Sequence, residues 1–229
     1  MRARSATLAS LLCVAGCASE GARAHVDLPR GRAPSEQDRV AREVGRLLGS
    51  DARASKEAED ALHALDAPGR AALAAHARRI PGERDPRWLH VLDEQGLLPP
   101  LSDRDLVALH LWEAARGGGP AVAKAQATLE RVAVSDPEVL VEAIARPGPS
   151  RDLVALVLGR SHVTRAVPAL VALYRDGTTA AERRAAADAL GRLLGADARP
   201  PADADDAERA VEARRLLASL PTEKPRGAP

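Results

Sequence analysis

The pattern of apolar and polar positions predicts helices, most clearly near the C-terminal end of the chain. Apolar side chains recur there at spacings of three and four: Val163, Ala166, Val167, Leu170, Leu173 and Tyr174. Residues at this spacing share one side of a 3.6-residue helix, so we expect that side to be buried. With Thr164 as the N-cap, Pro168 lies in the first turn, where its missing N–H has no intrahelical partner to lose. Asp176-Gly177 then ends this helix.

A second helix is predicted directly after it. Thr179 and Glu182 have the spacing of a capping box, in which each side chain bonds the other's free backbone N–H. Small residues dominate its apolar stripe and allow a neighbouring helix to approach: Ala186, Ala189, Leu190 and Leu193. Arg184 and Asp188 project from the opposite side, and Gly195 is a suitable left-handed stop.

The same periodicity predicts helices through the rest of the chain, so the fold class is all-α. In the N-terminal part of the chain, one helical stripe of apolar residues stops at Gly49 and a second begins after Ser55. Further helices are expected at 68–79, 86–95, 103–116, 120–133, 137–145, 151–159 and about 204–219. Turn and breaker clusters separate them, and Asp136-Pro137 has the order of a cap followed by proline at the first helical position.

The predicted helix pair at 164–195 resembles a known repeat. AVPALVAL followed by ERRAAADALGRL is similar to the HEAT repeat, in particular to the short variety whose second helix ends with a Leu-Gly pair. Leu158-Gly159 and Leu190-Gly191 carry that pair 32 residues apart. The resemblance implies a short α-solenoid of stacked helical hairpins. An ordinary Ala/Leu-rich helical bundle has the same periodicity and is the alternative.

Repeats elsewhere in the chain are less regular. RDLVAL occurs at 104–109 and again at 151–156, a separation of 47 residues, and DALxxL at 60–65 returns at 188–193. Because 47 residues disagrees with the spacing of 32, we interpret the array as irregular HEAT-like hairpins with one inserted helix.

The N-terminus has the order of a secretory signal. Arg2 and Arg4 precede an apolar run that ends at Val14 and is too short to cross a bilayer. The sequence Val14-Ala15-Gly16-Cys17 is similar to the bacterial lipobox, which implies that residues 1–16 are removed and that Cys17 is acylated. A cut after Ala24 is the alternative. We then expect a lipidated tether at 17–36, the repeat domain at 37–219 and a polar tail at 220–229.

Composition and charge limit the classes of partner that this chain is expected to bind. Without Arg2 and Arg4 the chain carries 31 basic against 32 acidic residues. This near-neutral balance lacks the excess of basic residues that is typical of nucleic-acid-binding proteins. Cys13 leaves with the signal and Cys17 is blocked by lipid, so no disulfide or free thiol is expected. Ala18 after the cysteine, where inner-membrane lipoproteins have aspartate, favours the periplasmic face of the outer membrane.

Residues with catalytic or metal-binding chemistry do not form a known motif. The chain has no HExxH, no GxSxG and no Gly-rich phosphate loop. His90 with Asp93 and Glu94, or His110 with Glu113, would place ligands one helical turn apart. A third ligand is not nominated, so we expect surface or half-buried histidines and no metal site. Trp88 and Trp112 lie beside leucines at core spacing and are predicted to be core residues.

These observations favour a non-enzymatic, lipid-anchored scaffold of the bacterial cell envelope, without a cofactor, that binds an unidentified protein partner through a solenoid surface. Arg184 and Asp188 are the predicted partner contacts, because in HEAT-like solenoids that strip commonly lines the concave face. One alternative is a HEAT-like enzyme of the bilin-lyase type, against which export and the lack of a catalytic constellation argue. A structural helical lipoprotein without a specific ligand is the other.

Overall fold

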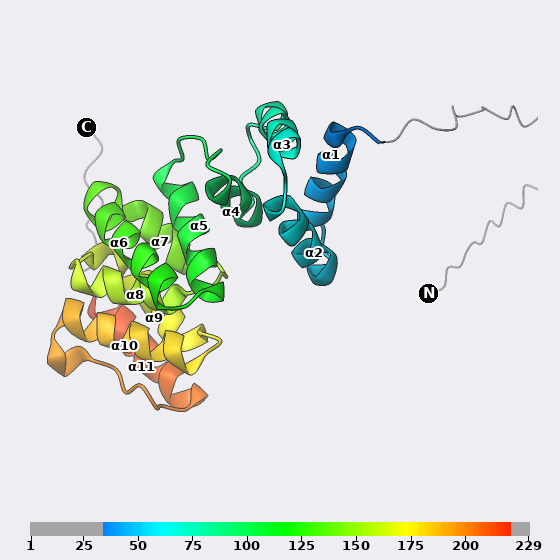
Figure 1. Ribbon diagram of the computed structural model, residues 1–229. Coiled ribbons are helices and arrows are strands. Elements are labelled where there is room, and N and C mark those ends of the chain that lie inside the picture. The colour runs from blue at the N-terminus through cyan, green and yellow to red at the C-terminus, as the bar shows by residue number, and fades with distance from the viewer. Residues whose placement is uncertain (1–33, 221–229) are drawn as a thin grey trace, which may run out of the picture. The chain divides into compact units, whose positions relative to one another are not determined.

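The computed structural model describes residues 34–220, and in this range it contains α-helices and two short 3₁₀ helices but no strand (Figure 1). The α-helices are α1 (Glu36–Leu47), α2 (Ala52–His63), α3 (Ala67–Arg79), α4 (Pro86–Glu94), α5 (Asp103–Arg116), α6 (Gly119–Ser135), α7 (Pro137–Ala145), α8 (Arg151–Arg160), α9 (Val167–Asp176), α10 (Ala180–Leu194) and α11 (Asp206–Ser219). The 3₁₀ helices are η1 (Thr164–Ala166) and η2 (Ala196–Ala198). The all-α prediction is therefore confirmed for the described residues. None of their helices has the length and apolarity needed to span a bilayer.

The predicted helix starts are confirmed at most positions and are wrong for α2 and α9. Asp51 accepts hydrogen bonds from the backbone N–H groups of Arg53 and Ala54, so α2 begins at Ala52 and not after Ser55. Ser55 is buried inside the first turns and donates to the Leu47 carbonyl at 2.8 Å. Asp136 precedes Pro137 as predicted, but its side chain makes no capping hydrogen bond.

The helix pair at 164–195 forms with one change at its start. Thr164 does not cap α9, because the 3₁₀ turn η1 comes first and α9 begins at Val167. Pro168 still lies in the first turn. The predicted capping box of α10 is confirmed: Thr179 Oγ1 accepts from Glu182 N at 3.1 Å, and Glu182 Oε2 accepts from Thr179 N at 3.3 Å. Gly195 ends α10 at φ 103° and ψ 156°, outside the left-handed helical region and in one that glycine alone adopts readily.

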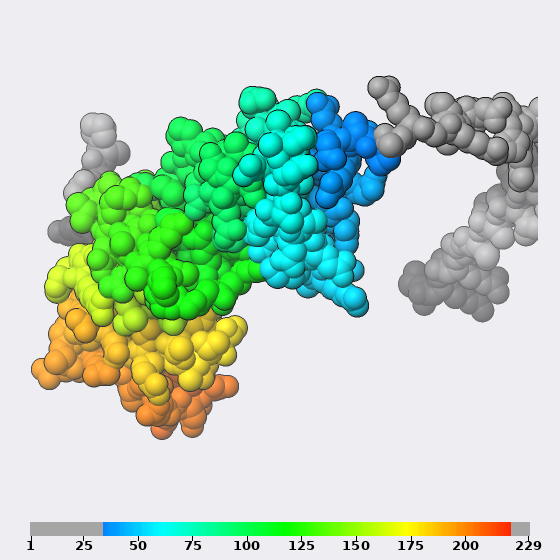
Figure 2. Space-filling model, in the orientation of Figure 1, coloured from blue at the N-terminus to red at the C-terminus, as the bar shows by residue number. Residues whose placement is uncertain are grey.

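Helices α5 to α11 pack in two alternating layers. In one layer α5 contacts α7, α7 contacts α9, and α9 contacts α11, while in the other α6 contacts α8 and α8 contacts α10. Figure 2 shows the colours in chain order, in agreement with contacts between helices that are close in sequence. The alternation has no interruption, so the inserted helix expected in the middle is not found. The two RDLVAL segments lie in α5 and α8, which belong to different layers and are not equivalent.

The Leu-Gly pairs occupy neighbouring helices of one layer, α8 and α10. A Cβ atom built at Gly159 would lie 2.7 Å from the Cα of Ala189. The stripe of small residues on α10 therefore meets the backbone of α8, as predicted. Leu190 is fully buried in the apolar cluster that these helices share, whereas Leu193 is only partly buried.

Buried apolar residues form two clusters. The first contains residues of α1 to α4, including the fully buried Leu62 and the almost fully buried Trp88. The second contains residues of α5 to α11, including Tyr174 and Leu190. Trp88 is thus a core residue as predicted. Trp112 is only half-buried, so the core interpretation of its position is wrong.

The segment 195–205 runs along α10 before α11 begins. Arg199 forms an ion pair with Asp188 of α10, and Arg184 Nη2 lies 3.8 Å from Asp203 Oδ1. The buried Tyr174 of α9 donates its hydroxyl to the Pro201 carbonyl at 2.9 Å. These contacts hold the segment against the end of the two layers.

Candidate functional site

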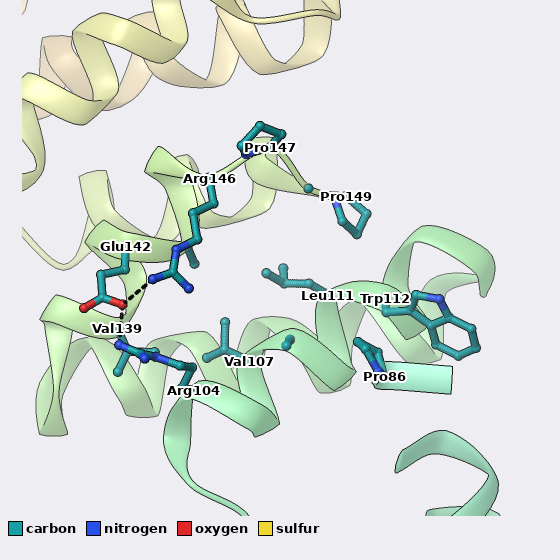
Figure 3. Close-up of a pocket in the computed structure, with 13 residues that line it drawn as sticks. Pro86, Arg104, Val107, Leu111, Trp112, Val139, Glu142, Arg146, Pro147 and Pro149 are labelled. Atoms are coloured by element: carbon teal, nitrogen blue, oxygen red, sulfur yellow. Dashed lines mark hydrogen bonds and ion pairs between the residues drawn. The ribbon is translucent and has the colours of Figure 1, made fainter. Parts of the chain in front are cut away.

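An apolar groove lies between α5 and α7 and is the candidate site (Figure 3). Its volume is about 230 Å³. The lining residues are Pro86, Arg104, Val107, Ala108, Leu111, Trp112, Val139, Glu142, Ala143, Arg146, Pro147, Gly148 and Pro149. Most of them come from two neighbouring helices of one layer and from the loop that follows α7.

Helical spacing explains the floor of the groove. Val107 and Leu111 are four residues apart on α5, and Val139 and Ala143 are four apart on α7, so each pair faces the same way. Val107, Leu111 and Val139 are buried. Ala143 and Ala108 of the facing helix have side chains of one carbon, which leave the space between the helices open.

The loop after α7 forms a wall and is held by one unusual residue. Pro147 and Pro149 lie above the groove in Figure 3. Ser150 follows at φ 55° and ψ 31°, in the left-handed region, and donates its hydroxyl to the Leu111 carbonyl at 3.3 Å. Two prolines with fixed φ and a side-chain bond to α5 keep this wall in place without a ligand.

The rim carries an excess of positive charge. Arg104 and Arg146 both bind Glu142 Oε2, Arg146 at 3.3 Å, and both arginine side chains are more than half exposed. Two guanidinium groups thus share one carboxylate, so within residues 34–220 one positive charge beside the apolar walls has no counter-charge (Figure 3). A carboxylate from another molecule would complete this arrangement.

Trp112 closes the other end of the groove and also lines a second hollow. The guanidinium carbon of Arg116 lies 4.3 Å from the centroid of its ring, a cation–π contact, and the ring of His90 lies 5.1 Å away. His90, Trp112 and Arg116 also line the second hollow together with Lys124. The half-buried Trp112 therefore lines both the groove and the second hollow.

The histidines considered as ligands have partners that their spacing in the sequence does not show. His110 is buried and its Nδ1 lies 2.7 Å from Thr128 Oγ1, not against Glu113. Burial lowers the pKa of His110, and the charge of Lys124 lowers it further, so this side chain is neutral at pH 7. Glu113 instead lies 3.0 Å from His90 Nδ1.

The two predicted partner contacts lie on the other layer, away from the groove. Arg184 is exposed on α10, whereas Asp188 is half-buried and paired with Arg199. Asp188 lines a shallow hollow that also includes Arg192 and Arg199. The segment 195–205 therefore covers part of the strip that the sequence predicted to be open. Whether a partner binds there stays a prediction, and Cys17 lies outside the described residues.

Neither the groove nor the environment of His90 was found from the sequence. The available signals were the Pro147-Gly148-Pro149 cluster, which marks a rigid loop, and Trp112, which has a polar neighbour at Glu113 on its own helix. Comparison with protein-family models, with curated proteins and with solved structures gives no match to this chain.

Proposed function

We propose that this chain is a non-enzymatic scaffold of the bacterial cell envelope that holds a protein partner on the surface of a short α-solenoid. The two alternating layers of α5 to α11 support the solenoid part of the proposal, because stacked hairpins produce this order of contacts. The lipobox-like sequence supports lipid attachment at Cys17, and Ala18 after it supports a place on the periplasmic face of the outer membrane. The resemblance of residues 164–195 to short HEAT repeats points the same way.

The observation that carries the proposal is the groove between α5 and α7. Small-molecule sites usually enclose about 300–1,000 Å³. A space of about 230 Å³ open along two helices suits one or two apolar side chains of a peptide segment better. Arg104 and Arg146 at the rim favour a carboxylate beside those side chains. The proposed occupant is therefore a partner segment that has an acidic residue close to an apolar anchor.

The strip of Arg184 and Asp188 is the second surface to test. It is already engaged by Arg199 and Asp203, so a partner has to compete with contacts within the chain. Exposed ion pairs of this kind contribute only about 0–1 kcal/mol. They therefore do not exclude binding, but they make the groove the preferred surface.

A site-specific photo-cross-linker identifies the partner. It is placed at Ala108, on the groove, and in a control at Val211, which is 60% exposed on α11 and does not line the groove. Cross-linking in intact cells followed by mass spectrometry should capture a protein from Ala108 that is not captured from Val211. The same proteins captured from both positions would contradict a specific groove.

Binding of the captured partner then separates the two surfaces. Ala108→Arg, which fills the groove, should weaken binding at least tenfold, and so should Arg104→Ala combined with Arg146→Ala. Val211→Arg should leave both the affinity and the circular dichroism spectrum unchanged. If only Arg184→Ala with Asp188→Ala weakens binding, the partner uses the second layer and the groove proposal is wrong.

A further inference from the structure

Two pairs of histidine and glutamate face each other across the contact between α2 and α4. Each pair is four residues apart, so its members share one face of their helix. The helices contact each other. We name the four side chains the α2–α4 cluster: Glu59, His63, His90 and Glu94.

The side chains of the α2–α4 cluster lie close enough to one another to share a metal ion. Ligand atoms of Glu59, His63 and His90 all lie within 4.8 Å of one another. The two oxygens of Glu94 lie 3.3 Å from His63 Nε2 and 3.4 Å from His90 Nε2. A tetrahedral zinc ion with bonds of about 2.0–2.2 Å holds its ligand atoms about 3.3–3.6 Å apart. Glu94 thus already lies at this spacing from both histidines, whereas Glu59 would have to turn one oxygen away from Arg116 to join them.

The hydrogen bonding of the two histidines leaves their Nε2 atoms available. His63 Nε2 is buried and has no hydrogen-bond partner, although Glu94 lies beside it. His90 Nδ1 lies 3.0 Å from Glu113 Oε1, and with the proton on Nδ1 the lone pair of Nε2 points toward the cluster. Metal-binding histidines regularly bond a carboxylate through their other nitrogen in this manner. Glu113 is itself buried and fixed by Lys124 Nζ at 3.2 Å.

The charges around the α2–α4 cluster also favour a divalent cation. Arg116 holds both oxygens of the buried Glu59 at 2.9 and 3.0 Å. Apart from the histidines, the connected ion pairs among the described residues contain five carboxylates and three cations, a net charge of −2: Glu59, Asp60, Asp93, Glu94 and Glu113 against Lys56, Arg116 and Lys124. One divalent ion would neutralise this network.

We propose that the α2–α4 cluster is a structural binding site for a zinc-class divalent ion, with two imidazole and two carboxylate ligands. Imidazole nitrogens select zinc and its neighbours over magnesium and calcium, which take oxygen ligands. The ion fixes α4 to α2, beside the contact of α4 with α5. Glu113 is a positioning residue that acts through His90.

Metal binding is tested on the full chain with Cys13→Ser and Cys17→Ser, so that no thiol provides a ligand. After treatment with a chelator, titration with ZnCl₂ by calorimetry should give one ion per chain. Co²⁺ should produce the intense visible absorption of tetrahedral coordination. His63→Gln and His90→Gln should each weaken Zn²⁺ binding at least tenfold, and Glu113→Gln should weaken it about 10–100-fold.

The control is His162→Asn, which changes an exposed histidine outside the cluster at a positive φ that asparagine tolerates. It should bind Zn²⁺ like the parent chain. Circular dichroism shows whether each variant is folded, and Zn²⁺ should raise the Tm of the parent but not of folded His63→Gln. Absence of Zn²⁺ binding by the parent, or equal binding by His63→Gln and His162→Asn, would overturn the proposal.

Discussion

Replacing Gly159 by alanine is expected to destabilise the protein, although alanine is the better helix former. A Cβ at residue 159 would lie 2.7 Å from Ala189 Cα and 2.9 Å from Ala189 Cβ. Carbon atoms pack at about 3.5–4.0 Å, so α8 and α10 would have to separate by about 1 Å. Since the opposing atom belongs to the backbone of α10, no change of rotamer relieves the contact.

The magnitude follows from two opposing effects. Overpacking costs about 1–3 kcal/mol, and a contact with backbone belongs at the upper end of that range. The higher helix propensity of alanine offsets up to about 1 kcal/mol of this cost. The net loss is therefore about 2 kcal/mol. For a domain of this size, about 1 kcal/mol shifts the Tm by about 2–4 °C, so the Tm should fall by about 4–8 °C.

Gly45 is the matched control, because it also lies inside a helix but has no atom within 4 Å of a built Cβ. Gly45→Ala should keep the propensity gain and stabilise its helix by up to about 1 kcal/mol. Thermal unfolding followed by circular dichroism measures both variants against the parent chain. A Tm for Gly159→Ala at or above that of the parent would refute the close approach of α8 and α10.

Three further predictions concern stability, pH and the anchor. Leu190→Ala should lower the free energy of unfolding by about 2–5 kcal/mol, measured by chemical denaturation. Leu190 is fully buried on α10, which packs on α8 and α9, so truncating its side chain leaves a cavity. Burial acts to raise the pKa of Glu182, but hydrogen bonds, chiefly from Arg151, bring it below its usual value. The stability that Glu182 contributes is thus present at neutral pH and lost as the pH falls through the lowered pKa. The difference in Tm between the parent chain and Glu182→Gln should therefore become smaller as the pH is lowered. Metabolic labelling with a palmitate analogue should mark the parent chain and not Cys17→Ser, and equal labelling of both would contradict lipid attachment at this cysteine.

The positions of the helices could be predicted because their signals are local. The capping box of Thr179 and Glu182, the proline in the first turn of α9 and the 3.6-residue stripes depend only on residues within a few positions. The start of α2 was missed for a local reason as well. Its apolar stripe begins at Ala58, but the cap is Asp51, and the intervening turns bury the hydroxyl of Ser55.

The groove and the α2–α4 cluster could not be predicted, because both depend on how separate helices meet. Spacing alone pairs Glu113 with His110 on the same helix, whereas the packing of α4 on α5 brings Glu113 to His90. Trp112 has leucine neighbours like those of Trp88, yet it faces two surface hollows. The sequence contains these side chains but not the pairing of helices that brings them together.

The segment 195–205 determines where this protein could be lengthened. It is tied to α10 by Arg199 and to α9 by Tyr174, so a helical hairpin appended after Gly195 would have to displace it. A duplicate of the 164–195 pair inserted at the turn after α8 would leave these ties and α11 intact at the new end. A longer array would therefore gain units more easily between α8 and α9 than directly after Gly195.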